Sequence, residues 1–402
     1  MKTLSLLEII GRNSPLFKED LRAHEAELSD QIANSRFLVV GGAGSIGGAV
    51  VHELFARNPQ VLHVIDTSEN NLAELVRDIR SSLGYIEGDF HAFCFDALGS
   101  EFNAFAKQAL GQGKPYDYVL NFSALKHVRS EKDPFTLMRL IDVNIFLTRK
   151  LLEFAQLGGA KKFFCVSTDK AANPVSMMGG SKRIMEMFLL GEESSTEVST
   201  ARFANVAFSD GSLPHAWTRR MRNRQPLSAP TDIRRYFVTG QEGAQLCLFS
   251  ILLGHDHEIY FPKLSSSLNL ITFSSMAERY LQSLGYEPFL CDTEDEARSR
   301  VDELSAKRQW PCYFFKTDTS GEKDFEEFYT DAEHVDWKRY SEIGVVRNEA
   351  VAPQEQLQAF LQRIDALRNE QIWTKHDLLQ AFRELLPNFA HMETGKNLDD
   401  RM

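Results

Sequence analysis

Residues 37–47 read Phe37-Leu38-Val39-Val40-Gly41-Gly42-Ala43-Gly44-Ser45-Ile46-Gly47, an apolar run that passes directly into a glycine-rich turn. The run predicts a buried strand, and residues 48–57 predict the helix that follows it. The glycines have the spacing G-x-x-G-x-x-G. The first permits a tight turn, the second lets a pyrophosphate approach the backbone, and the third lets the helix pack closely on the strand. The stretch therefore predicts a dinucleotide-binding unit, with Ser45 and Ile46 beside the pyrophosphate.

Acidic residues follow the next two predicted strands. The strand at 61–65 ends in Asp66, about 20 residues beyond the glycines, where an acid binds the ribose hydroxyls of NAD. This position favours NAD over NADP. The strand at 91–95 ends in Asp96, and we expect Asp96 and Ala97 on the adenine side of the cofactor.

Strands and helices continue to alternate along the chain. Further strands are predicted at 117–122, 162–167 and 200–206, with a helix from about 134 to 157. This alternation predicts an α/β fold with a doubly wound parallel sheet, and the weaker pattern beyond 240 predicts a smaller C-terminal substrate lobe. The expected division is an N-terminal helical extension (1–34), a dinucleotide-binding domain (35–205), mainly a substrate lobe (206–345) and a C-terminal helical extension (346–402).

A second stretch carries the candidate chemistry. The apolar strand that ends at Ser167 is followed by Thr168, Asp169 and Lys170, and then by a helix that carries Lys182. In open α/β sheets ligands bind beyond the carboxyl ends of the strands, so a hydroxyl, a carboxylate and an amine would enter the site together. The alternative is that Thr168 and Asp169 cap a helix, a role that both residue types favour.

Composition narrows the class of protein. The chain has 402 residues, 43% apolar and 25% charged, as in a soluble globular enzyme. A formal net charge of -11 argues against non-specific nucleic-acid binding, which needs a basic face. Five scattered cysteines without a CxxC pair favour free thiols in a reducing compartment and no metal site. Without an apolar run near the ~20 residues of a membrane span or a signal-peptide pattern, we expect a cytoplasmic protein.

Two features leave alternatives open. Asn144 lies among apolar residues of the predicted helix at 134–157, either as a satisfied core residue or as one that steadies the active-site lysine. The second feature is a local arginine cluster in an otherwise acidic chain. It lies on a solvated helix face or contributes a phosphate contact; its members are Arg219, Arg220, Arg222, Arg224, Arg234 and Arg235.

Two segments connect the chain to a known family. Residues 121–128 read NFSALKHV and residues 167–174 read STDKAANP. With them the chain resembles the extended short-chain dehydrogenase/reductase superfamily, and within it the nucleotide-sugar 4,6-dehydratases of bacterial surface-glycan synthesis. Matching segments also occur at 202–206, 235–237 and 321–328. The resemblance implies a Rossmann-like fold, bound NAD and a homo-oligomer, either a dimer or a larger assembly.

The resemblance also implies a role for each site residue. Asp169 would protonate the departing C6 hydroxyl, and Lys170 would take the C5 proton. Thr168 would hydrogen-bond the C4 hydroxyl, and Lys182 would bind the nicotinamide ribose. The nicotinamide pocket would be lined by Ser123 and Ala124. The sugar nucleotide would contact Lys126, His127, Asn205, Ser212 and Arg235, although a solvated loop remains the alternative for the first two and a strand turn for Asn205.

The chain departs from the superfamily at one position. The superfamily usually has Tyr-x-x-x-Lys, with tyrosine as the base for the sugar hydroxyl, whereas the residue four before Lys182 is Met178. Positions i and i+4 share a helix face, so Met178 takes the place of the tyrosine but cannot accept a proton. One subgroup of these dehydratases carries methionine there. The C4 hydroxyl proton would then leave through Thr168 and water, or through a neighbouring carboxylate.

The implied reaction is an internal redox cycle on UDP-N-acetylglucosamine. C4 is oxidised, water is lost across C5 and C6, and hydride returns to C6 to give a 4-keto-6-deoxy sugar. The alternatives are the GDP-linked sugar, as in a route to legionaminic acid, a C5-inverting dehydratase or epimerase, and a non-catalytic NAD-binding protein. An epimerase needs no acid at C6, so Asp169 argues against that alternative.

Overall fold

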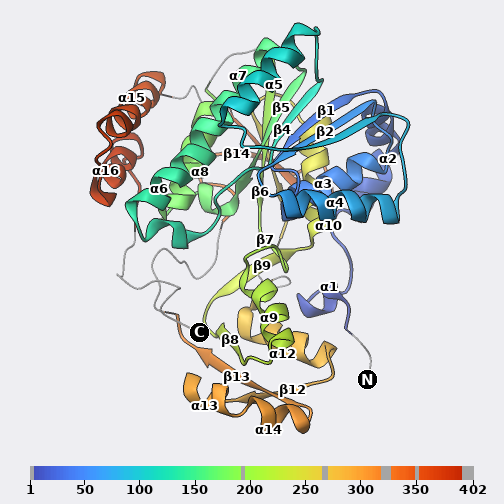
Figure 1. Cartoon of the computed structure of the whole chain (residues 1–402), viewed down its shortest axis with the longest axis vertical. Helices are drawn as coiled ribbons and strands as arrows, with labels where there is room; N and C mark the ends of the chain where they lie inside the picture. The colour runs from blue at the N-terminus through green and yellow to red at the C-terminus, as the bar shows by residue number, and fades with distance from the viewer. Residues whose placement is uncertain (1–3, 192–194, 265–269, 318–326, 349–352, 392–402) are drawn as a thin grey trace.

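The computed structural model describes residues 4–191, 195–264, 270–317, 327–348 and 353–391, so part of the segment at 321–328 lies outside the described residues. Figure 1 shows an upper part built on a large sheet and a smaller lower part, with β7 (Asn205–Val206) and β9 (Arg234–Val238) between them.

The large sheet has nine strands in the order β14-β15-β10-β6-β5-β4-β1-β2-β3. Neighbours from β10 to β3 are parallel, whereas β15 and β14 extend the other edge in antiparallel pairing. The predicted doubly wound parallel sheet is confirmed. The strands are β1 (Arg36–Val40), β2 (Val61–Asp66), β3 (Asp89–Cys94), β4 (Tyr118–Asn121), β5 (Lys162–Thr168), β6 (Glu197–Phe203), β10 (Glu258–Pro262), β14 (His334–Asp336) and β15 (Ile343–Arg347).

Strand order places the site. β1 lies between β2 and β4, so the chain winds outward from β1 in both directions. The crevice at such a switch point, beyond the carboxyl ends of the strands, is where ligands bind in open α/β sheets.

Helices cover both faces of this sheet. β1 is apolar from Phe37 to Val40 because both of its faces are buried: Phe37 and Val39 face one core cluster, and Leu38 and Val40 face the other. The first cluster is covered by α2 (Lys18–Ala33), α3 (Ser45–Phe55), α4 (Glu69–Ser82) and α10 (Gly240–Leu248), and the second by α5 (Ser100–Gly111), α7 (Leu147–Leu157) and α8 (Met177–Leu189).

The helix predicted over 134–157 is interrupted. It consists of α6 (Pro134–Ile141), a π-helical turn η2 (Asp142–Phe146) and α7. Asn144 lies in the π-helical turn. Such turns inside α-helices occur frequently at functional sites.

The lower part holds two three-stranded sheets, with the strand orders β11-β9-β7 and β12-β13-β8. Its further elements are α1 (Leu6–Ile9), β8 (Leu227–Pro230), α9 (Leu213–Arg222), β11 (Leu270–Thr272), α12 (Phe273–Ser283), β12 (Glu287–Leu290), α13 (Glu294–Ser299), α14 (Val301–Ala306) and β13 (Gln309–Phe315). The range 206–345, expected to form mainly a substrate lobe, contributes to both parts. Its elements β10, β14, most of β15 and α10 return to the large sheet, because their apolar residues complete the upper core.

The terminal extensions pack on the body. In the N-terminal segment, Arg12 makes a buried bidentate pair with Glu242 of α10. At the other end, α15 (Gln354–Glu370) and α16 (Lys375–Leu385) lie outside α6 and α8 (Figure 1). Phe382 packs against Gly180, so the C-terminal helices contact the helix that carries Lys182.

Two expectations from the composition concern the state of the cysteines and membrane-spanning segments. All five cysteines are described, and each is a free thiol. Every helix within the described residues is too short or too polar to cross a bilayer.

Candidate active site

The glycine turn has the shape that the sequence predicted. Gly41 has a φ of 75°, and a Cβ there would lie 2.5 Å from the backbone nitrogen of Ser123. A Cβ at Gly47 would lie 2.2 Å from the Gly41 carbonyl oxygen, so helix, turn and the loop after β4 meet closely. No side chain among the described residues caps the first turn of α3 at Gly44. Its open N–H groups therefore fit the pyrophosphate of a dinucleotide.

Two acidic side chains hold this turn in place. Asp66, the last residue of β2, accepts hydrogen bonds from the backbone N–H of Ala43 (3.0 Å) and Ser68 (2.9 Å). Ser45 donates from Oγ to Asp210 at 3.0 Å, which links the turn to the loop after β7. Ile46 is the second residue of α3. Hydrogen bonds to Asp66 and to Asp210 therefore fix the conformation of the turn.

Asp96 lies just beyond β3 and already has a cationic partner. Its Oδ2 accepts a hydrogen bond from Arg139 at 2.7 Å, and its Oδ1 accepts one from the backbone of Leu98 at 2.9 Å. Although burial opposes the shift, these hydrogen bonds hold the pKa of Asp96 below its ordinary value. Ala97 beside it is buried. The predicted contact with adenine stays a prediction.

The three predicted catalytic groups at the end of β5 are in contact. Thr168 Oγ1 donates to Asp169 Oδ1 at 2.9 Å, and Lys170 approaches the same oxygen with its backbone nitrogen (2.9 Å) and its Nζ (3.2 Å). Asp169 is 3% exposed and the Lys170 side chain 20%, so the acid is buried while the amine reaches the surface. Thr168 also caps η3 (Asp169–Ala171). The capping interpretation and the catalytic one are thus compatible.

Helix α8 brings Lys182 to the same place. A Cβ at Gly179 would lie 2.6 Å from the Lys170 carbonyl oxygen, so glycine there lets α8 contact η3. Lys182 is buried and donates from Nζ to the Val166 carbonyl at 2.9 Å. Burial lowers the pKa of its ammonium group. Met178 is buried in an apolar cluster with α6 and the C-terminal helices, and so contributes packing.

Asn144 joins the two halves of the site. Its side chain accepts from the backbone N–H of Leu125 (3.0 Å) and donates to the Leu125 carbonyl (3.1 Å) and to Ser181 Oγ (2.9 Å). Asn144 is therefore a satisfied core residue that also connects the loop after β4 to the neighbour of Lys182.

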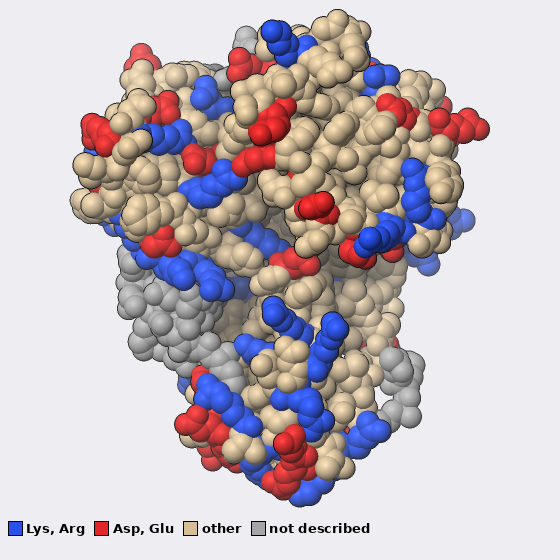
Figure 2. Space-filling view, viewed as in Figure 1, with Lys and Arg blue, Asp and Glu red and all other residues tan. Residues whose placement is uncertain are grey.

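Two of the predicted substrate residues face the lower part. Lys126 donates from Nζ to Ser209 Oγ at 3.3 Å. A Cβ at Gly211 would lie 2.7 Å from Nε2 of His127, so the ring of His127 packs against Gly211. Burial lowers the pKa of both Lys126 and His127. Figure 2 shows lysine and arginine side chains on both sides of the hollow between the two parts.

The other predicted substrate residues have structural partners. Asn205 donates to the Tyr236 carbonyl at 3.5 Å, Ser212 caps α9, and the buried Arg235 donates to the Arg234 carbonyl at 2.9 Å. Within the arginine cluster, Arg220 bonds Ser228 and Arg224 pairs with Asp302. Roles of these residues toward a substrate stay predictions.

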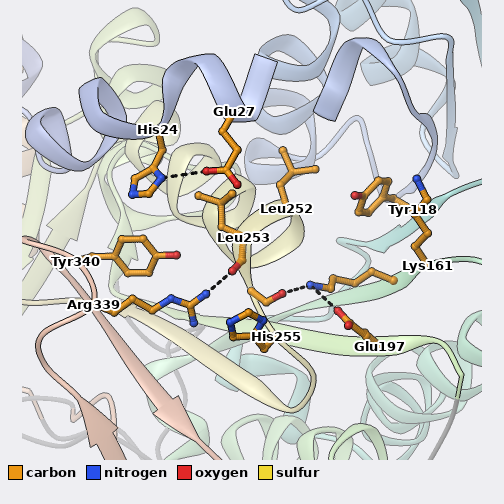
Figure 3. A pocket seen from close by; sticks show the side chains of 12 residues that line it. His24, Glu27, Tyr118, Lys161, Glu197, Leu252, Leu253, His255, Arg339 and Tyr340 are labelled. Atoms are coloured by element: carbon orange, nitrogen blue, oxygen red, sulfur yellow. Dashed lines mark hydrogen bonds and ion pairs between the residues drawn. The ribbon is translucent and has the colours of Figure 1, made fainter. Parts of the chain in front are cut away.

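A pocket of about 530 Å³ lies at the opposite ends of the strands, beside the amino ends of β4, β5 and β6 (Figure 3). None of the predicted site residues lines it. Its Lys162 contacts the Gly254 carbonyl and Glu197, and its Arg339 donates to the Leu253 carbonyl. These two cations therefore bind groups of the protein itself. The candidate catalytic residues lie at the carboxyl ends of the strands, away from this pocket.

Comparisons with known proteins identify the family of the chain. The sequence model of a family described as "Polysaccharide biosynthesis protein" matches residues 37–348. The uncharacterized membrane protein MJ1061 of Methanocaldococcus jannaschii is 29% identical over 65% of this chain and 76% of its own length. The capsular polysaccharide biosynthesis protein CapD of Staphylococcus aureus is 27% identical over 67% of this chain, which spans 44% of CapD.

Two further similarities concern a named enzyme and a solved structure. The UDP-N-acetylglucosamine 4,6-dehydratase (inverting) of Campylobacter jejuni is 25% identical over 57% of this chain and 67% of its own length. The X-ray structure of Pen from Bacillus thuringiensis superposes with a TM-score of 0.63 at 18% identity, covering 85% of this chain and 99% of Pen. At this identity the likeness to Pen concerns the fold.

Proposed function

Because the chain belongs to the polysaccharide biosynthesis protein family, we propose that it is an NAD-dependent nucleotide-sugar 4,6-dehydratase acting on UDP-N-acetylglucosamine. The observation that carries the proposal is the contact of Thr168, Asp169 and Lys170 at the end of β5. Loss of water from a sugar needs an acid for the leaving hydroxyl and a base for the neighbouring carbon, and this contact supplies one of each.

The cofactor would occupy the crevice at the β1–β4 switch point. The open N–H groups of α3 would bind its pyrophosphate, Asp66 would accept from the ribose hydroxyls, and Lys182 would bind the nicotinamide ribose. Bound NAD would supply the hydride acceptor and donor of the reaction. Because hydride leaves and returns within one cycle, tight retention of the cofactor suits this chemistry.

The 3.2 Å contact between Lys170 Nζ and Asp169 Oδ1 places a candidate base and a candidate acid side by side. The elimination needs Lys170 as a neutral amine and Asp169 as a carboxylic acid when it begins. Lys170 then takes the C5 proton while Asp169 gives its proton to the departing C6 hydroxyl. The elimination step thus leaves Lys170 as an ammonium and Asp169 as a carboxylate.

The proton of the C4 hydroxyl also has a route that does not need a tyrosine. Thr168 Oγ1 donates directly to Asp169 Oδ1, so a sugar hydroxyl bound to Thr168 can pass its proton through this hydroxyl to the carboxylate. Asp169 gives this proton to the C6 hydroxyl as water leaves, and Lys170 returns the C5 proton when C6 is reduced, so the protons balance over the cycle. This route combines the Thr168 hydroxyl with a neighbouring carboxylate and needs no proton acceptor at position 178, where Met178 packs against α6.

Mass spectrometry of the sugar nucleotide tests the proposal. Purified protein is incubated without added cofactor with UDP-N-acetylglucosamine and, separately, with GDP-N-acetylglucosamine. Loss of one water from the UDP sugar supports the proposal, and loss from the GDP sugar alone reassigns the nucleotide. An isomer of unchanged mass would indicate an epimerase, and no change after NAD is supplied would refute a dehydratase of either sugar.

Two variants test the assigned roles. Asp169→Asn should stop water loss while NAD stays bound, because the amide cannot donate a carboxylic proton. Lys170→Ala should stop exchange of the C5 proton with solvent deuterium, measured by NMR of the product and of recovered substrate. Turnover near the wild-type rate in either variant would contradict its role.

A further inference from the structure

A fully buried ion pair lies directly behind the candidate site. Arg202 of β6 donates to Glu186 of α8 from Nε (2.9 Å) and Nη2 (2.7 Å), and both side chains are 0% exposed. Desolvating two charges costs several kcal/mol per ion, so such a pair is weak evidence for a purely stabilising role. Arg202 belongs to the matching segment at 202–206, whereas Glu186 was not predicted as a site residue. Its signal was a glutamate one helical turn beyond Lys182.

The pair reaches the strand that carries the catalytic groups. Ser167 Oγ donates to Glu186 Oε1 at 2.6 Å, the same oxygen that binds Arg202 Nε. Ser167 immediately precedes Thr168. The Glu186 carboxylate thus ties the end of β5 to α8.

The pair also reaches the segment that leads into β14. Arg202 Nη1 donates to the Phe328 carbonyl at 2.9 Å, and Arg202 bonds both oxygens of Glu333 at 2.8 Å. Glu333 in turn accepts from the Thr330 backbone at 2.8 Å. Arg202 is therefore held by two carboxylates, of which Glu186 faces the site and Glu333 faces the β14 side.

Glu186 is also an anion near the Lys182 ammonium. Lys182 lies one turn earlier on α8, and the ionisable groups that act on it are Cys165 of β5 and Glu186. Burial lowers the pKa of Lys182, and the thiol and the carboxylate oppose that shift. Glu186 Oε2 also contacts two cations, Arg202 Nη2 at 2.7 Å and Arg183 Nη1 at 3.3 Å.

We propose that Glu186 is a positioning residue of the active site, which fixes the Ser167–Lys170 end of β5 and places a carboxylate one helical turn from Lys182. The inference rests on the proposed function in that Lys182 acts as a cation beside the cofactor. Because the Glu186 side chain is fully buried, it acts through Ser167 and Lys182.

The test compares Glu186→Gln with the matched control Glu333→Gln. Each variant keeps the side-chain shape and removes one of the two negative charges that hold Arg202, so both should lower the melting temperature to a similar degree. Only Glu186→Gln lies next to Lys182. Its alkaline limb of kcat against pH should move to lower pH, because the carboxylate that opposes the effect of burial on Lys182 is removed.

Two further variants separate charge from shape. Glu186→Asp keeps the charge and should restore the alkaline limb. Ser167→Ala removes the hydrogen bond without changing any charge; it should lower kcat about tenfold while KM for the sugar nucleotide and the pH limbs stay unchanged, since one buried bond contributes roughly 1.4 kcal/mol. If Glu186→Gln fails to fold, an unchanged kcat in Ser167→Ala overturns the positioning role.

Failure of this inference can be told apart from failure of the proposed function. Wild-type turnover of UDP-N-acetylglucosamine tests the function alone. If the wild type shows none, the same variants are compared by the pH dependence of NAD+ affinity, which needs no turnover. Equal pH behaviour of Glu186→Gln and Glu333→Gln, in turnover or in NAD+ binding, overturns the inference.

Discussion

Gly47→Ala should destabilise the protein and weaken NAD binding, whereas Gly48→Ala should do neither. Both glycines lie in the first turn of α3. A Cβ at Gly47 would lie 2.2 Å from the Gly41 carbonyl oxygen and 2.9 Å from Gly42 Cα, whereas at Gly48 the nearest atom is 3.6 Å away. The first contact is roughly 1 Å short of van der Waals distance, and both atoms belong to backbone that cannot rotate away.

The magnitudes follow from these distances. Alanine in place of glycine inside a helix stabilises by about 0.5–1 kcal/mol, which Gly48→Ala should show in full. Overpacking costs about 1–3 kcal/mol, so the free energies of unfolding of the two variants should differ by about 2 kcal/mol or more. Moving α3 away from the turn also displaces the N–H groups proposed to bind pyrophosphate. We expect NAD affinity to fall about tenfold or more in Gly47→Ala.

Urea unfolding followed by circular dichroism gives the stability difference, and calorimetric titration of cofactor-stripped protein gives the NAD affinity. Gly48→Ala serves as the matched control for helix propensity. If Gly47→Ala binds NAD as tightly as Gly48→Ala, the close approach of helix and turn does not shape the cofactor site, and the reasoning is refuted.

Two predictions concern the terminal extensions. Phe382→Ala should lower the free energy of unfolding by about 3–5 kcal/mol and reduce turnover, because the fully buried ring packs on Gly180 of the Lys182 helix; normal stability in urea would contradict this packing. Although burial opposes it, hydrogen bonds from Arg12 and from two backbone N–H groups hold the pKa of Glu242 below 4.5. Its stabilising contribution should be complete above pH 4.5 and lost as the pH falls through the folded pKa. Unfolding measured from pH 7 to 3 should therefore show wild type losing stability relative to Glu242→Gln, and a constant difference would count against the prediction.

The sequence by itself determined the class of fold and the residues on which the proposed chemistry rests. Apolar strands that alternate with helices, and glycines at 41, 44 and 47, have one ready physical solution, a parallel sheet with helices on both faces. The resemblance to nucleotide-sugar dehydratases of the extended short-chain dehydrogenase/reductase superfamily is confirmed by the family match over residues 37–348. The contact of Thr168, Asp169 and Lys170 was predictable because neighbours at a strand end share one edge of the sheet.

Tertiary structure decided the features that depend on residues far apart in the chain. Periodicity cannot show that strands after residue 240 return to the large sheet, since strand order depends on how the whole chain packs. From the sequence alone, a glutamate on a helix is expected to face solvent. Only the fold shows that β6 brings the Arg202 guanidinium to a buried Glu186. Likewise, Asn144 remained ambiguous because its partners, Leu125 and Ser181, are 19 and 37 residues away. A stretch of sequence determines which functional groups it carries, whereas contacts between residues far apart in the chain depend on how the whole chain packs.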